Sequence, residues 1–230
     1  MTKAIAMIVD RQMRRWELEK SRPQEKVPLL EKPGPIITIS RQHGATGSLV
    51  AEKLAELTGF TLIGRDIIDQ ISLDIGTQKR LVETLDESMR SKFELWVEGL
   101  FKGRIVDTSD YLKSLVKIIG AISHHGKAII VGRGANFILG SRQGFHVRIV
   151  ADLIFRVNSL MTRRNLSRAE AQEAISRNDE HRRKFIKSDF RKDIDDPQAY
   201  DMVINSTHLS IEHAAQLILN AFPLKKYDPN

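Results

Sequence analysis

The sequence predicts an α/β fold in which a parallel sheet is covered by helices on both faces. Short apolar runs alternate along the chain with helical patterns, and this alternation is typical of parallel sheets. The chain has 230 residues, of which 41% are hydrophobic, enough for one such domain with additions. The five predicted strands are residues 36–39, 60–63, 127–131, 145–150 and 200–204. The predicted helices are residues 48–58, 66–75, 77–104, 108–125 and 152–164, one that begins at Ser167, and 210–221.

The composition excludes several classes of protein. The chain contains no cysteine, which excludes a disulfide framework, a cysteine nucleophile and cysteine-ligated zinc. No apolar run is long enough to span a bilayer. The apolar segment AIAMIV near the N-terminus is followed at once by Asp10 and Arg11, which is not typical of a signal peptide. We therefore expect a cytoplasmic protein.

Residues 1–34 are predicted to be separate from the main domain, which spans residues 35–230. Residues 2–19 predict an amphipathic helix, and residues 21–35 contain four of the seven prolines and predict an extended linker. Two roles for the helix stay open: packing on the protein's own core, which we favour, and a homodimer contact. Its apolar positions are Ile5, Ile8, Val9, Met13 and Trp16.

The stretch from Pro35 to Ala51 predicts a phosphate-binding loop. A buried strand leads into SRQHGATG, and a helix follows. Glycines let backbone amides approach an anion, and the helix N-terminus adds partial positive charge. The standard pattern is G-x-x-x-x-G-K-[ST]. With Gly47 as its second glycine, Gln42 replaces the first, Ser48 replaces the lysine and Leu49 replaces the hydroxyl. The alternative is a tight turn without a ligand.

Glycine and arginine occur together after three of the predicted strands. The segments are SRQHGATG, then GRD from Gly64, then GRGAN from Gly132. Because parallel strands end at one edge of the sheet, where ligands bind, these segments predict a polyphosphate site or a site for two nucleotides. Residues 156–192 also hold eleven Lys and Arg against five Asp and Glu, most of the net charge of +7. This cluster favours a polyanion partner or is a solvated helix face. Its few aromatic residues suit a core, so nucleic acid is disfavoured.

These segments together resemble the cytidylate kinase-like family of nucleoside monophosphate kinases. The resemblance runs from Ile36 to the last helix, through ITISRQHGATG, FTLIGRDII, AIIVGRGANFIL, FHVRIVADLIFRVNSLMTRRNLS, NDEHRRKFIKSDF and DDPQAYDMVIN. It implies a P-loop kinase-like three-layer sandwich with a five-stranded parallel sheet and a helical lid at about residues 156–192. It also implies ATP and Mg²⁺ as cofactors.

The resemblance carries roles to particular residues. Those implied for the donor phosphates are Gly44, Ala45, Thr46, Gly47 and Ser48. Because the loop departs from the standard pattern, we expect Thr46 or Ser48, together with water, to hold magnesium. Those implied for the acceptor nucleotide are Arg65, Asp66 and Arg133. Those implied around the transferring phosphoryl group are Arg41, Arg163, Arg164, Asp179, Arg182 and Arg183. Arginine suits these roles because its planar fork binds two phosphate oxygens at once.

The function expected from this resemblance is transfer of a phosphoryl group from ATP to CMP or dCMP. The missing loop lysine leaves activity open, and we expect Arg41 or a lid arginine to supply the charge. The alternative is a nucleotide-binding regulator or pseudokinase, which the degenerate loop favours. The expected partner is a small nucleotide, with no membrane.

Overall fold

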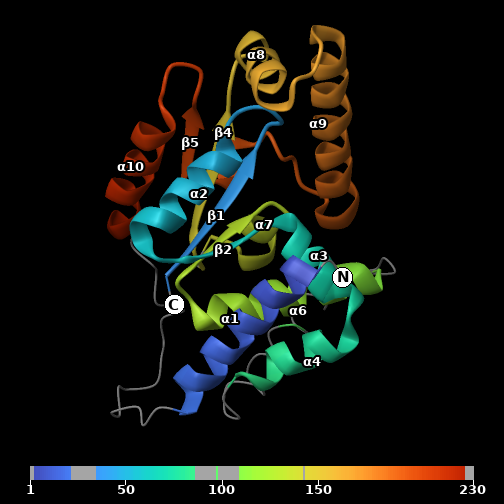
Figure 1. Ribbon diagram of the computed structural model, residues 1–230, viewed down its shortest axis with the longest axis vertical. Coiled ribbons are helices and arrows are strands. Elements are labelled where there is room, and N and C mark those ends of the chain that lie inside the picture. The colour runs from blue at the N-terminus through green and yellow to red at the C-terminus, as the bar shows by residue number, and fades with distance from the viewer. Residues whose placement is uncertain (1–2, 22–34, 86–96, 98–108, 142, 226–230) are drawn as a thin grey trace. The chain divides into compact units, whose positions relative to one another are not determined.

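The computed structural model describes residues 3–21, 35–85, 97, 109–141 and 143–225 (Figure 1). Residues 22–34 of the predicted linker at 21–35 and most of the predicted helix at 77–104 lie outside these residues, whereas Ser21 belongs to the first helix. Within the described ranges, no helix has the length and apolar character needed to cross a membrane. The residues fall into two compact units by their contacts. One consists mainly of residues 36–62 and 127–228, and the other mainly of 1–35 and 63–126.

The five-stranded parallel sheet confirms the predicted fold class. The strands are β1 (Ile36–Arg41), β2 (Thr61–Ile63), β3 (Ala128–Val131), β4 (Phe145–Val150) and β5 (Met202–Asn205). Their spatial order is β2-β3-β1-β4-β5. β1 lies at the centre, paired in parallel with β3 and with β4. The fifth strand begins later than predicted, because a short 3-10 turn, η1 (Pro197–Ala199), precedes it.

One face of the sheet carries the main apolar core. Ile37 and Ile39 of β1 and Val147 of β4 are fully buried there. The helices on this face are α2 (Gly47–Thr58) and α10 (Ile211–Ala221), which contact each other (Figure 1). The predicted stop of α2 is correct, because Gly59 adopts the left-handed conformation and its N–H donates to the carbonyl of Ala55.

The alternate residues of β1 and β4 form a second, polar face. Thr38, His146 and Arg148 are buried there. The Thr38 hydroxyl lies 2.8 Å from Nδ1 of His146, whose Nε2 lies 2.8 Å from the carbonyl oxygen of Gly140. Burial lowers the pKa of His146, so its imidazole is neutral. Both ring nitrogens of His146 are therefore paired within the protein, as burial requires.

Three further helices complete this unit: α7 (Ala135–Leu139), α8 (Leu153–Arg164) and α9 (Arg168–Phe190). A last 3-10 turn, η2 (Phe222–Leu224), follows α10. The predicted capping box at the start of α9 is confirmed, because the Ser167 hydroxyl accepts from the N–H of Glu170 and the Glu170 carboxylate accepts from the N–H of Ser167. α8 and α9 pack against each other.

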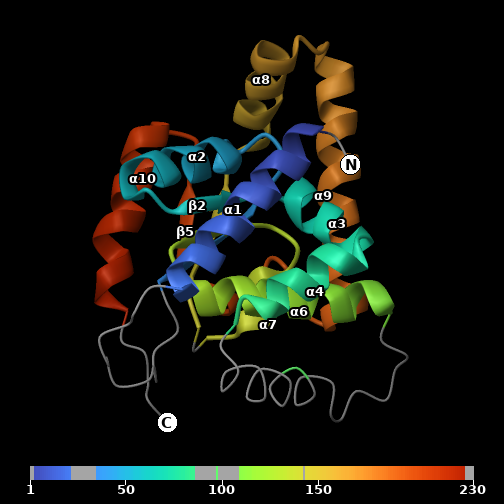
Figure 2. The ribbon, with the colours of Figure 1, turned by 60° about the horizontal axis from the view of Figure 1, so that its bottom comes forward.

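The other unit is helical. It contains α1 (Lys3–Ser21), α3 (Arg65–Leu73), α4 (Ile75–Glu83) and α6 (Asp110–His125), and α6 contacts both α3 and α4 (Figure 2). The apolar face of α1 is buried through Val9, Met13 and Trp16. The Trp16 ring stacks on the ring of His125 with centroids 4.4 Å apart. The predicted helix therefore forms, and its apolar face packs within its own unit.

Candidate active site

The loop between β1 and α2 contains two residues with unusual backbone dihedral angles. Gly44 has φ +84° and Thr46 has φ +58°, both in the left-handed region. For a threonine this conformation costs about 1–2 kcal/mol. A Cβ at Gly44 would lie 2.8 Å from the carbonyl oxygen of Arg156, so α8 packs directly on the loop. Strain and close approach of this kind are typical of functional loops.

Arg41 is the last residue of β1, and its side chain reaches the turn that follows β3. A Cβ added at Gly47 would lie 2.6 Å from Cβ of Arg41, and one added at Gly132 would lie 2.6 Å from its Nη1. The guanidinium of Arg41 therefore lies against the turn that follows β3. The structure thus brings together the first and third of the predicted glycine–arginine segments.

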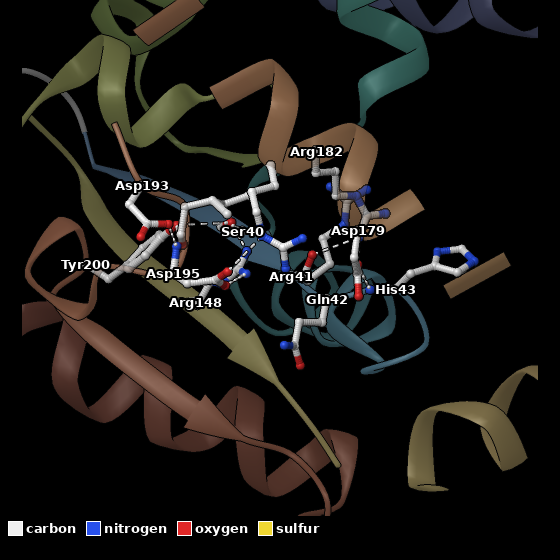
Figure 3. A network of polar contacts seen from close by, with 12 residues as sticks. Ser40, Arg41, Gln42, His43, Arg148, Asp179, Arg182, Asp193, Asp195 and Tyr200 are labelled. Carbon is white, nitrogen blue, oxygen red and sulfur yellow. Dashed lines mark hydrogen bonds and ion pairs between the residues drawn. The ribbon is translucent and has the colours of Figure 1, made fainter. Parts of the chain in front are cut away.

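The helix α9, which lies within the predicted lid, contacts this loop through one carboxylate (Figure 3). Oδ1 of Asp179 accepts a hydrogen bond of 2.8 Å from the backbone N–H of His43. Its Oδ2 lies 2.5 Å from Nη1 of Arg156. Nη1 of Arg182 donates to the carbonyl oxygen of Arg41 at 2.8 Å and lies 3.5 Å from Oδ1 of Asp179. Two arginines and one carboxylate therefore close over the loop.

The electrostatics at His43 show that the loop lies in positive potential. The pKa of His43 is lowered to about 4, first by burial and then by the charges of Arg182 and Arg164; Asp179 opposes this shift, and Arg41 adds a smaller lowering effect. An imidazole surrounded by arginines is neutral at physiological pH. Such a field attracts an anion such as a polyphosphate.

A second polar cluster lies beside the loop on the polar face of the sheet (Figure 3). Arg148 donates from Nη1 to the Ser40 hydroxyl at 2.8 Å and pairs through Nη2 with Asp195 at 2.7 Å. Asp195 also lies 3.4 Å from Nε of Arg183 on α9. The Tyr200 hydroxyl donates to the carbonyl of Ile194 at 2.7 Å. The segment after α9 is thereby tied to β4.

The remaining arginines with expected roles lie at three places. Arg133 follows β3 with φ +54°, and its Cζ lies 5.9 Å from the ring centroid of Phe185 on α9. Arg163 and Arg164 are exposed at the C-terminal end of α8. Arg65 begins α3 in the helical unit, where it pairs weakly with Asp66 at 3.9 Å and with Asp69 at 3.6 Å. Their expected roles toward a nucleotide stay predictions.

The two expected magnesium ligands lie at the start of α2. The Thr46 hydroxyl donates to the carbonyl of Ala45 at 2.7 Å, which leaves its lone pairs as acceptors. Ser48 is exposed in the first turn of α2. Because Mg²⁺ is usually held by one or two protein oxygens, water and substrate phosphates, these residues fit it. Among the described residues, no cluster of His, Asp and Glu could hold a metal ion instead.

Sequence reasoning missed Arg156, Ser40 and Arg148. A signal for the last two was present, because apolar and polar residues alternate in Ile37-Thr38-Ile39-Ser40 and in Phe145-His-Val-Arg148-Ile149. Alternation of period two indicates two different faces of a strand. Arg156 lies within the predicted lid, but nothing in the sequence indicates that its backbone contacts Gly44.

The fold and the loop define this chain as a P-loop kinase-like protein. Its strand order places β1 at the centre of a parallel sheet, and the loop and α2 follow β1 in the chain. The profile of the cytidylate kinase-like family matches residues 36–208, so the chain belongs to that family.

Individual relatives agree with this assignment. The cytidylate kinase of Saccharolobus islandicus is 27% identical over 209 residues, which cover 85% of this chain and 98% of that protein. A protein of Corynebacterium glutamicum named uronate isomerase is 25% identical over 179 residues, 71% of this chain, but the chain spans only 34% of its length. A solved structure of an uncharacterized protein from Eubacterium ventriosum has a TM-score of 0.58 at 20% identity and covers 83% of this chain and 99% of that one. That likeness supports the fold.

Proposed function

We propose that the chain transfers the terminal phosphoryl group of Mg²⁺-ATP to a nucleoside monophosphate, with CMP or dCMP as the acceptor. Arg41, Arg156 and Arg182 converge on a strained glycine loop at a helix N-terminus, and this observation carries the proposal. The loop amides and the N-terminus of α2 would hold donor phosphates. Family membership supports the reaction class, and the relative from S. islandicus, named a cytidylate kinase, suggests the acceptor.

The reaction needs positioning and positive charge more than covalent help. An acceptor phosphate oxygen bonds to the γ-phosphorus as the bond to the β–γ bridging oxygen breaks, and ADP leaves. Arginines around the γ-phosphoryl group would stabilise the charge that spreads over its oxygens. Bound Mg²⁺ would neutralise the β- and γ-phosphates, with Thr46 or Ser48 among its ligands. Closure of α8 and α9 would exclude water that otherwise hydrolyses the donor.

Arg41 is our candidate for the charge that the missing loop lysine would supply. It follows β1 directly, and its Cβ lies next to Gly47, the first residue of α2. We expect Arg41→Ala to weaken ATP binding and to lower the rate of phosphoryl transfer by about 10²–10³. Unchanged affinity and rate would exclude this role.

A second candidate function is a nucleotide-binding regulator without turnover. Ser48 and Leu49 favour it, because Ser48 lacks the charge of the usual lysine and Leu49 lacks the hydroxyl that usually follows that lysine. Such a protein binds ATP and forms no diphosphate.

A phosphotransfer panel separates the two functions. Purified protein is incubated with Mg²⁺-ATP and each of CMP, dCMP, UMP, AMP and GMP, and the products are quantified. We expect a diphosphate from CMP or dCMP that is lost in Arg133→Ala and kept in Arg177→Ala, an exposed arginine of α9 paired with Glu173. Folded protein that makes no diphosphate from any acceptor would overturn the kinase proposal.

We also propose a cytoplasmic location and, as the alternative role of the N-terminal helix, a homodimer contact through α1. Met7, Ile8 and Leu18 of α1 are exposed apolar residues, whereas Val9, Met13 and Trp16 are buried within the helical unit. Light scattering after size-exclusion chromatography measures the mass directly. A monomer at micromolar concentration would exclude a stable homodimer.

A further inference from the structure

Asp179 makes the contacts that a phosphate group makes in a phosphate-binding loop. One of its oxygens accepts from the backbone N–H of His43 (Figure 3). The other accepts from the guanidinium of Arg156. Loop amides and arginines are the usual donors to bound phosphate. A carboxylate of the protein itself therefore satisfies donors that a polyphosphate would use.

The contact is largely shielded from water. The Asp179 side chain is 16% exposed and that of Arg156 is 11% exposed. A charge in such a place is costly unless an opposite charge accompanies it. Without a ligand, Asp179 supplies the negative charge that Arg156 requires.

The same contact holds the lid. Asp179 and Arg182 both lie on α9, and each bonds to the backbone at the end of β1 or in the loop, at His43 and at Arg41. Releasing Asp179 removes one of these two ties. A ligand that replaces this carboxylate therefore also changes what holds α9.

We propose that Asp179 is an internal anion that occupies a phosphate-binding position of the loop and that the donor polyphosphate displaces. The proposal rests on the proposed function and names the regulation of that same site. Displacement transfers the His43 amide and the Arg156 guanidinium from Asp179 to the phosphates. Nucleotide binding is then weakened by the competition, and one of the two ties between α9 and the loop region is released when a polyphosphate binds, whereas the bond from Arg182 to Arg41 stays.

A purely structural role for Asp179 predicts the opposite result. In that case the carboxylate holds Arg156 in position for the ligand, and its removal weakens anion binding. In our proposal the carboxylate competes with the ligand, and its removal strengthens anion binding. The sign of the change in affinity therefore decides between them.

The test compares Asp179→Asn with Glu180→Gln. Glu180 is the adjacent residue on α9 and pairs with Lys184 at 2.7 Å in an exposed position, so both variants lose one negative charge from the same helix. Affinity for inorganic tripolyphosphate is measured by calorimetry, with circular dichroism as the check on folding. We expect Asp179→Asn to bind about tenfold more tightly than the wild type, the size of one charge-assisted hydrogen bond, and Glu180→Gln to bind within twofold.

An Asp179→Asn protein that binds tripolyphosphate equally or more weakly would overturn the proposal. Equal binding with normal diphosphate formation overturns the internal anion alone, whereas absence of tripolyphosphate binding in both proteins overturns the proposed function as well. The wild-type chain gives a second readout that does not require the variant to fold. The carboxyl ¹³C resonance of Asp179 should shift on addition of tripolyphosphate, and an unchanged resonance contradicts displacement.

Discussion

The two faces of the central sheet are built from the same strands and perform different tasks. On one face, Ile37 and Val147 pack against α2 and α10 in the apolar core. On the other face, their neighbours Thr38 and Arg148 hydrogen-bond to His146 of β4 and to Ser40 of β1. Adjacent residues of each strand therefore lie on opposite faces, where one packs in the apolar core and the next forms polar pairs.

The difference shows how the fold can carry a site without losing its core. The apolar face needs close packing, because burial of apolar surface is the main source of stability. The polar face requires hydrogen-bond partners for its buried groups. Arg148 finds such partners in Ser40 and Asp195, which lie near the loop at the carboxyl edge of the sheet (Figure 3). We infer that the first face stabilises the sheet and the second positions the segments around the ligand.

Substitutions on the two faces should therefore differ most in their effect on stability. Ile37→Ala removes a fully buried side chain and should cost about 3 kcal/mol of unfolding free energy. Arg148→Met replaces a buried charge by an apolar side chain of similar length, and removing one partner of an ion pair is costly only where the remaining charge is buried. Its partner Asp195 is 43% exposed and still contacts Arg183, so we expect a cost below about 1 kcal/mol. Urea unfolding followed by circular dichroism measures both.

The denaturant dependence of each unfolding curve is the control, since an unchanged slope shows that both variants expose the same surface on unfolding. A loss for Arg148→Met as large as that for Ile37→Ala would contradict the comparison. The polar face would then be as much a part of the core as the apolar face.

A pair of glycine substitutions sharpens the comparison at the edge of the sheet. Gly132 and Gly140 both have positive φ, +84° and +68°, so alanine strains the backbone at both. Only at Gly132 does the added Cβ meet the guanidinium of Arg41, at 2.6 Å, whereas at Gly140 nothing lies within 4 Å. We expect Gly132→Ala to lower kcat/KM for phosphoryl transfer at least about tenfold, because it displaces Arg41.

Gly140→Ala is the matched control and should lose stability without a comparable loss of kcat/KM. Steady-state rates measured at a temperature where both variants are folded separate the two effects. Equal losses of kcat/KM would mean that backbone strain, and not the position of Arg41, limits the reaction.

Much of the fold could be predicted from the sequence because its signals are local. Strand composition, the stop at Gly59 and the capping box at Ser167 and Glu170 each depend on neighbouring residues, and each prediction is confirmed. The loop could be located for the same reason. The conformation of Thr46 could not, because the sequence there gives no sign that a threonine adopts a positive φ.

The contacts that close the site depend on residues far apart in the chain. Asp179 and His43 are separated by 136 positions, and Arg148 and Ser40 by 108. Family resemblance indicated that Asp179 belongs to the lid, but neither spacing nor periodicity indicates which backbone amide it meets. Such pairings follow from strand order and helix packing, which are set by the whole chain.

The smallest expected effect concerns the dependence of stability on pH at His43. Its pKa is about 4 in the folded protein, below the usual 6.5, because of burial and the nearby arginines. Between these values the unfolded chain binds more protons than the folded one, so stability rises with pH. The contribution is complete above pH 6.5 and is lost as pH falls toward 4. The variant His43→Gln keeps the backbone N–H that donates to Asp179. We expect this variant to lose less stability than the wild type as the pH falls.

The measurement is the urea midpoint at several pH values between 4 and 7 for the wild type, His43→Gln and His208→Gln. His208 is an exposed histidine after β5 and controls for loss of an imidazole. The effect is small because His43 is only half-buried and water screens part of its interaction with Arg182, Arg164 and Arg41. If His43→Gln keeps the full wild-type slope, His43 does not titrate in the positive field that we infer. The attraction of the loop for polyphosphate would then have to come from its amides and from α2.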